Sequence, residues 1–265
     1  MSGMIEKIKV WFKLIRPPLF ILGFLVSFAL LRFYNVWNED FTKGLLITLS
    51  VGFGHAAFTL FNEIHDVPQD KINKPWKPLP SGLVSVQRAT ILSIIMFLIS
   101  LFSLLAISDT RYILLGLIGY IGSFYYNLTN DRAVIGYIFY TLPFFIACFI
   151  STGLKDIVLP LIFTFIAICQ NMGVQLQDLE ADMRANVKTL PQVIGKTKTK
   201  IICSILCCIT ISFICVSILP TISKFLFILS TIMIMIGTII ELQELFLRIG
   251  SRSMVLLGFL SIILR

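Results

Sequence analysis

Long apolar segments alternate with short polar ones along nearly the whole chain. A helix that crosses a bilayer needs about 17–25 mostly apolar residues, and nine segments approach that length before a charge, a proline or a glycine ends them. These segments are Pro18–Tyr34, Lys43–Ile64, Val86–Ile107, Tyr112–Tyr126, Val134–Thr152, Ile157–Leu176, Ile201–Leu219, Phe225–Leu245 and Met254–Leu264. Several are short, so we expect them to be tilted or buried between neighbours. The pattern predicts an all-α membrane protein, a bundle of about nine transmembrane helices forming one domain over residues 1–265.

The composition agrees with this class. Hydrophobic residues make up 57% of the chain, charged residues 14%, and the mean hydropathy is +0.92. Soluble domains are about 45–50% apolar and about 25% charged, so a soluble globule is disfavoured and a disordered chain is excluded. All six cysteines fall inside apolar runs without the spacings typical of metal sites. We interpret them as reduced, small hydrophobic side chains.

The charges orient the predicted helices. Net charge is +8, from 22 Lys and Arg against 14 Asp and Glu. In a soluble protein this excess would suggest a nucleic-acid partner, but here the basic residues lie between apolar segments, so we expect membrane lipids and no nucleic acid as partners. With the N-terminus in the cytosol, 16 of the 22 basic residues fall on the cytosolic side. The two long polar stretches, Asp66–Ser85 and Gln175–Lys200, fall there too, so we expect a multi-pass protein of the cell membrane with these loops in the cytosol.

Six of the fourteen carboxylates form two clusters, each at the cytosolic end of a predicted helix. Asn62, Asp66 and Asp70 are spaced four residues apart in the first cluster. Asp178 and Asp182 have the same spacing in the second, and on a helix that spacing stacks oxygen ligands along one face. Neighbouring carboxylates repel each other, so such a face attracts cations. Oxygen ligands without His or Cys favour Mg²⁺ or Ca²⁺ over Zn²⁺.

Basic residues accompany both clusters. Lys71, Lys74 and Lys77 follow the first, and Arg184 and Lys188 follow the second. Mg²⁺ held by a few carboxylates usually shares its shell with substrate phosphates, so acids and bases at one membrane face fit a metal–diphosphate complex. One cluster alone could equally mark a solvated helix end. Two clusters of equal spacing on the same side favour a functional site.

The two clusters resemble the motifs of the UbiA superfamily of intramembrane prenyltransferases. Asn62-Glu-Ile-His-Asp66-Val-Pro-Gln-Asp70 is similar to the first motif, NxxxDxxxD, including its Pro-rich tail that ends in Ser-Gly. Asp178-Leu-Glu-Ala-Asp182 is similar to the second, DxxxD, with a Thr-Leu-Pro tail. Motif order, a separation of roughly one hundred residues and the helix count agree as well, so the resemblance covers nearly the whole chain.

The resemblance implies a bundle around a central cavity in which a prenyl diphosphate binds with two Mg²⁺ ions. The expected metal ligands are Asn62, Asp66, Asp70, Asp178 and Asp182, of which the four aspartates are the expected catalytic residues. The expected diphosphate contacts are Lys71, Lys77, Tyr126, Arg132 and Lys188. The C–O bond of the substrate would ionise towards an allylic carbocation, which an acceptor captures.

Three positions depart from the family pattern. Glu63 stands where Asp is usual, outside the ligand set. Pro68 lies inside the first motif, so we expect the helix to break after Asp66 and Asp70 to lie on a bent segment. Arg132 replaces the lysine expected after the fourth helix, and two interpretations stay open: it folds back to the diphosphate, or it only marks the cytosolic side.

The acceptor is the least determined part of the function. The first motif and its tail are similar to those of archaeal enzymes that prenylate geranylgeranylglyceryl phosphate, so an ether-lipid acceptor is favoured. An aromatic acceptor of quinone-type biosynthesis is the alternative. A transporter of a cation or a phosphorylated metabolite is a rival from another class, but both carboxylate clusters lie at one face and none near the midplane, where a translocation path requires them.

Overall fold

The computed structural model describes residues 10–15, 17–129, 131–240 and 252–263. Each of the nine predicted segments overlaps a helix, although residues 241–245 and 264 of the last two segments lie outside the described residues. The long helices are α2 (Pro17–Phe33), α4 (Phe41–His65), α6 (Val86–Leu105), α7 (Thr110–Leu128), α8 (Val134–Ser151), α9 (Val158–Gln177), α12 (Lys196–Val216), α13 (Thr221–Ile240) and α14 (Arg252–Ile263).

Local sequence determines where these helices begin. Pro17 opens α2 at a position where its missing N–H costs nothing. Asp40 caps α4 by accepting from the Lys43 backbone N–H at 2.9 Å, and Asp109 caps α7 by accepting from that of Arg111 at 3.0 Å. Between the caps the residues are almost all apolar, so the helices are held by packing and by their apolar surroundings.

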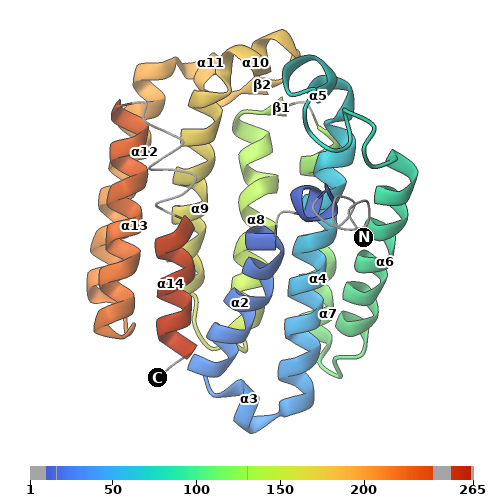
Figure 1. Cartoon of the computed structure of the whole chain (residues 1–265). Coiled ribbons are helices and arrows are strands. Elements are labelled where there is room, and N and C mark those ends of the chain that lie inside the picture. The colour runs from blue at the N-terminus through green and yellow to red at the C-terminus, as the bar shows by residue number, and fades with distance from the viewer. Residues whose placement is uncertain (1–9, 16, 130, 241–251, 264–265) are drawn as a thin grey trace, which may run out of the picture.

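The helices close into a ring. α2 packs against α4, α4 against α6, and the contacts continue through α7, α8, α9, α12 and α13 to α14, which packs back on α2. In Figure 1 the long helices run side by side, and the short elements gather at the two ends of the bundle. One end carries α5 (Val67–Asn73), α10 (Leu179–Arg184), α11 (Leu190–Ile194), β1 (Asp131–Arg132) and β2 (Lys188–Thr189); the other carries α3 (Val36–Glu39).

A two-stranded parallel sheet was not expected from the sequence. β1 pairs with β2 so that Asp131 lies opposite Lys188 and Arg132 opposite Thr189. The pairing ties the loop between α7 and α8 to the segment that follows the second carboxylate motif. It therefore brings Arg132 to the end of the bundle where both motifs lie.

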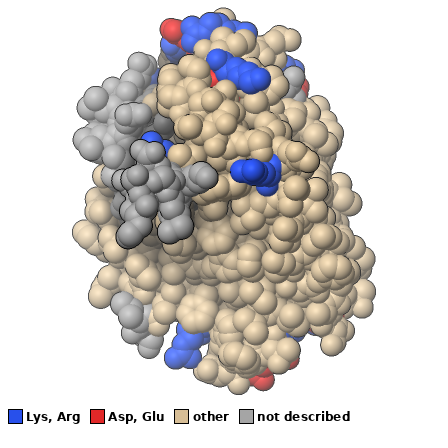
Figure 2. All heavy atoms as spheres, turned by 45° about the vertical axis from the view of Figure 1, so that its right-hand side comes forward, with Lys and Arg blue, Asp and Glu red and all other residues tan. Residues whose placement is uncertain are grey.

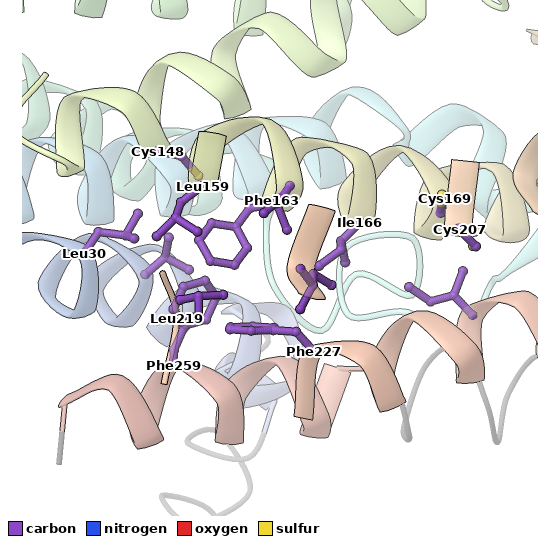
Figure 3. Packing of buried hydrophobic residues seen from close by; sticks show 14 of the residues in the cluster. Leu30, Cys148, Leu159, Phe163, Ile166, Cys169, Cys207, Leu219, Phe227 and Phe259 are labelled. Atoms are coloured by element: carbon purple, nitrogen blue, oxygen red, sulfur yellow. The ribbon is translucent and has the colours of Figure 1, made fainter. Parts of the chain in front are cut away.

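A large apolar cluster joins α2, α9, α12, α13 and α14. At its centre the rings of Phe163, Phe227 and Phe259 contact one another, with centroids 4.8–5.3 Å apart, as Figure 3 shows. Such aromatic packing contributes beyond the area it buries. The cluster fixes α9, the helix that leads into the second motif.

The outer surface is that of a multi-pass membrane protein. Among the described residues, five helices are long and apolar enough to cross a membrane: α4, α6, α9, α12 and α13. Ile91, Leu98 and Ile205 are among the large apolar side chains exposed on α6 and α12, and such contiguous apolar faces suit contact with lipid chains. In Figure 2 Lys and Arg gather mainly at the end that carries α5 and α10, and the flank between the two ends is mostly uncharged.

Candidate active site

A cavity of about 480 Å³ lies inside the ring of helices. Most of its lining is apolar and comes from α2, α8, α9 and α14, among them Leu22, Val26, Phe144, Phe163 and Phe259. Polar side chains of α4 and α7, such as Ser50, His55 and Tyr120, also line it. Its polar end, called the mouth from here on, is lined by Asn62, Tyr126, Arg132, Asp178 and Asp182. The cavity thus joins an apolar volume to a charged opening at the end of the bundle that carries α5 and α10.

The first motif spans the junction between α4 and α5. α4 ends at His65 and α5 begins at Val67 with Pro68 in its first turn, which confirms the predicted break after Asp66. The backbone nevertheless keeps the four-residue spacing across the bend, because Asp66 N–H donates to the Asn62 carbonyl at 2.9 Å and Asp70 N–H donates to that of Asp66 at 2.8 Å. Asn62 also donates from its side-chain amide to the Asp66 carboxylate at 3.0 Å.

The second motif repeats this construction on α9 and α10. Asp178 lies between the two helices, and its carbonyl accepts from the Asp182 N–H at 2.8 Å. Asp182 is buried, with 8% of its surface exposed. Burial, and after it the neighbouring charge of Asp178, raise the pKa of Asp182 to about 6. A carboxylate in this position is poorly stabilised by its surroundings and favours a bound cation.

Lys74 joins the two motifs across the mouth. Its ammonium Nζ lies 3.1 Å from Asp178 Oδ2, and the preceding Asn73 donates to the Ala181 carbonyl at 3.4 Å. From the sequence, Lys74 is expected only as one of the basic residues that accompany the first cluster, and it is not among the expected diphosphate contacts. Because the two partners are 104 positions apart, no local spacing signals the contact.

Arg132 points into the mouth from β1. Its Nη2 donates to Asp66 Oδ1 at 2.9 Å, and only 16% of its side chain is exposed. The guanidinium lies over the Tyr126 ring, 5.8 Å from the centroid. Burial acts to lower the pKa of Arg132, but the charge and hydrogen bond of Asp66, together with the nearby Tyr126 and Asp182, outweigh this effect. The pKa is therefore raised and the group stays charged. Its buried Nε has no hydrogen-bond partner among the described residues, so one donor of the guanidinium is left unsatisfied.

The remaining predicted residues lie around the mouth. Asp70 is buried and pairs with Lys77, whose Nζ is 2.6 Å from Asp70 Oδ2 and 3.1 Å from the Glu63 carboxylate. Lys188 is exposed and pairs with Asp131 at 3.1 Å, a contact that lowers the pKa of Asp131. Lys71 is exposed on α5. The structure therefore brings Asn62, Asp66, Tyr126, Arg132, Asp178 and Asp182 together, and holds Asp70 behind them with Lys77.

Gln175 braces the site from α9. Its amide nitrogen donates to the Arg132 carbonyl and to Asn171 Oδ1, both at 3.0 Å, and its oxygen accepts from the Leu190 N–H at 3.1 Å. One buried side chain thus links β1, α9 and α11. It positions the backbone that carries Arg132.

Three cysteines meet in the core, a proximity that their spacing in the sequence does not signal. The Sγ atoms of Cys169, Cys203 and Cys207 lie within 4.8 Å of one another, fully buried between α9 and α12. Figure 3 shows Cys169 and Cys207 at one edge of the large apolar cluster. Their small side chains allow the two helices to pack closely, in keeping with the apolar role expected for them.

The donor chemistry of the mouth fits Mg²⁺. The candidate ligands are carboxylate and amide oxygens, several of them buried, and oxygen ligands are what Mg²⁺ prefers. Asp66, Asp70 and Asp178 each contact a Lys or Arg of the chain, and Asp182 has its pKa raised by burial. Both observations indicate a site that requires positive charge.

Sequence relatives agree with one another. Residues 22–263 match the UbiA prenyltransferase family. The chain is 32% identical over 198 residues to a digeranylgeranylglyceryl phosphate synthase of Saccharolobus solfataricus, covering 70% of this chain and 66% of that protein. It is 26% identical to the enzyme of the same name from Sulfurisphaera tokodaii, covering 77% and 76% of the two chains.

Solved structures share the fold. A UbiA homolog from Archaeoglobus fulgidus bound to GPP and Mg²⁺ superimposes with a TM-score of 0.66 at 19% identity, covering 97% of this chain and all of that one. An apo UbiA homolog from Aeropyrum pernix K1 gives a TM-score of 0.70 at 16% identity, covering 94% and 96%. At these identities the likeness concerns the arrangement of the helices.

Proposed function

The chain belongs to the UbiA prenyltransferase family and is a membrane prenyltransferase, and on this premise we propose that it transfers a geranylgeranyl group from its diphosphate to geranylgeranylglyceryl phosphate. The acceptor is suggested by the relatives named digeranylgeranylglyceryl phosphate synthase. The observation that carries the proposal is the convergence of both carboxylate motifs on the mouth of one apolar cavity. A prenyl tail fits the apolar part, and a diphosphate fits the charged part.

The proposed metal ligands are Asn62, Asp66, Asp70, Asp178 and Asp182. Two Mg²⁺ ions bound there would neutralise negative charge on the departing diphosphate. Arg132 presents charged donors to the same diphosphate, and Tyr126 supports the guanidinium from one face. Lys71, Lys77 and Lys188 lie further out and raise the positive potential around the mouth.

The transfer exchanges one C–O bond for another. The bond between the allylic carbon and the diphosphate oxygen breaks with its electron pair on the diphosphate. The same carbon forms a bond to the acceptor hydroxyl oxygen, and the hydroxyl proton leaves with the diphosphate. The mostly apolar lining would limit the access of water, which would otherwise capture the carbocation. We also propose that all nine long helices cross the cell membrane and that the mouth faces the cytosol.

The test is transfer by the purified, detergent-solubilised chain. Labelled geranylgeranyl diphosphate and Mg²⁺ are supplied with geranylgeranylglyceryl phosphate in one arm and with an aromatic quinone precursor in another. We expect a labelled diether lipid in the first arm, its loss with EDTA, and near-complete loss in Asp66→Ala and Asp178→Ala proteins that still fold. Transfer to the aromatic compound alone would assign the other acceptor class, and activity that survives both substitutions would overturn the metal site.

A further inference from the structure

Two carboxylates of the candidate metal site are each held by a cation from a different part of the chain. Arg132 contacts Asp66 at 2.9 Å and Lys74 contacts Asp178 at 3.1 Å. A Mg²⁺ ion bound directly to a carboxylate oxygen at about 2.0–2.1 Å strongly repels a second cation that lies at hydrogen-bond distance from the same oxygen. A cation that shares its carboxylate oxygen with the metal would therefore have to move, or the metal would have to bind the other oxygen.

Lys74 is able to change its partner. It follows the last residue of α5, where the helical hydrogen bonding ends, and 30% of its side chain is exposed. Its four-carbon stem and three rotatable donors allow the ammonium to move without moving the backbone. Arg132, by contrast, is fixed by β1, by Tyr126 and by the Gln175 contact to its carbonyl.

A prenyl diphosphate offers Lys74 a second set of acceptors. The diphosphate would lie in the mouth, where Asp178 forms part of the lining, so its oxygens come within reach of a side chain that already contacts Asp178. The contact between Asn73 and the Ala181 carbonyl keeps the backbone next to Lys74 against α10. Lys74 can therefore exchange one acceptor for the other by rotating its side chain.

We propose that Lys74 is a diphosphate-binding residue that alternates between two partners: it holds Asp178 before the metal binds, and passes to the diphosphate when Mg²⁺ takes Asp178. The proposal rests on the proposed function. Under this proposal Lys74 competes with the metal for Asp178 and helps to bind the diphosphate. Removing the Lys74 side chain should therefore raise the affinity for the metal and lower the affinity for diphosphate. Replacing a residue with a purely structural role would lower both affinities, and removing a distant surface charge would change neither affinity.

The first test uses Lys74→Gln in the full-length, detergent-solubilised chain. Mn²⁺ is titrated without diphosphate and followed by electron paramagnetic resonance. Inorganic diphosphate is titrated with Mg²⁺ and followed by calorimetry. We expect Mn²⁺ to bind about two- to five-fold more tightly, because a partly exposed competing ion pair is gone. Diphosphate should bind about ten- to hundred-fold more weakly, because a charge-assisted contact is lost.

Two further variants serve as controls. Lys198→Gln removes one positive charge from the exposed start of α12 at the same end of the molecule, so both affinities should stay within about two-fold of the wild type. Lys74→Arg keeps the charge and should restore most of the diphosphate affinity. Unchanged or weaker Mn²⁺ binding by Lys74→Gln, or unchanged diphosphate binding, would overturn the proposal.

A measurement on the wild-type chain covers the case in which Lys74→Gln does not fold. Acetylation of Lys74 by a water-soluble reagent, read by mass spectrometry, should rise on adding Mg²⁺ and fall when diphosphate follows. Acetylation of Lys74 that does not change when Mg²⁺ is added would contradict the proposed exchange of partners. If the wild type binds no diphosphate at all, the proposed function is contradicted. If the wild type binds diphosphate but the acetylation of Lys74 does not change with either ligand, only the role of Lys74 is contradicted.

Discussion

Arg132 has the most informative surroundings of any single residue at the mouth. It is charged, largely buried and bonded to Asp66, and its buried Nε has no partner among the described residues. A group that only marks the cytosolic side of a membrane protein needs none of this burial. Of the two interpretations that the sequence left open, the surroundings favour contact with substrate.

Replacing Arg132 by Gln should slow prenyl transfer roughly ten- to hundred-fold, because one charge-assisted contact contributes about 1.5–3 kcal/mol. Arg132→Lys should fall in between, since it keeps the charge and loses the planar pair of donors. Steady-state rates with geranylgeranyl diphosphate measure both. Activity of Arg132→Gln within about two-fold of wild type, at equal membrane insertion, would leave the diphosphate to the lysines.

Asp182 should make the metal-free protein sensitive to pH. Its pKa in the folded chain, about 6, lies above the ordinary value of 3.8, so the fold is more stable when this carboxyl is protonated. That stability is present below about pH 4 and is lost as the pH rises through about 6, up to about 3 kcal/mol in total. Mg²⁺ binding should strengthen over the same range, because the ligand must lose its proton.

Thermal unfolding in EDTA, compared between wild type and Asp182→Asn, isolates this contribution from other titrating groups. The variant should be more stable than wild type at about pH 7 and equal to it at about pH 4. Equal stability at both pH values would show that Asp182 titrates normally.

At the scale of elements, the sequence predicts the helices and the motifs much better than it predicts the contacts between them. The nine long helices among the described residues follow from apolar length, and the break at Asp66 follows from Pro68, which has no N–H to donate. The pairing of β1 with β2 and the Lys74–Asp178 contact have no local signature, because both depend on how distant helices pack. The cysteine cluster likewise appears only when α9 and α12 are placed side by side.

Gln175 holds β1, α9 and α11 together at the site, so replacing it should lower both the stability of the protein and its rate of prenyl transfer. Gln175→Leu leaves the buried Leu190 N–H without its acceptor, at a cost of about 1–3 kcal/mol, and frees the backbone of β1. We expect a lower unfolding temperature and slower transfer, with Mn²⁺ affinity kept because no metal ligand is touched. Gln175→Glu keeps the acceptor for the Leu190 N–H and should recover part of the stability. If Gln175→Glu unfolds at the same temperature as Gln175→Leu, the hydrogen bond to Leu190 does not account for the loss of stability.

At the scale of the whole molecule, the two ends of the bundle differ in chemistry. One end carries both motifs and most of the described basic residues, while the other is held by the Lys155–Glu39 ion pair, at 2.7 Å, and by a hydrogen bond from Tyr34 to Asp156. The charge asymmetry supports the proposed orientation, with the motif-bearing end in the cytosol.

Single cysteines test this orientation. In a background that lacks the exposed Cys208 and Cys215, cysteines at Gln69 and Lys188 should both react with an impermeant maleimide from the cytosolic side only. One at Ile218, exposed after α12, should react from the other side only. Labelling of the first two positions from opposite faces would separate the motifs and end the model of a shared site.

The position of the mouth at one end of the bundle has a consequence for the membrane itself. Under the proposed function and orientation, the prenyl donor, the acceptor headgroup and the released diphosphate would all meet the protein at one face, so we expect the enzyme to work on one leaflet. Every product lipid would then form in that leaflet and would increase the area of that leaflet only. Balanced growth of the bilayer then depends on a separate means of moving the product across, and vesicles holding only this enzyme should accumulate product asymmetrically.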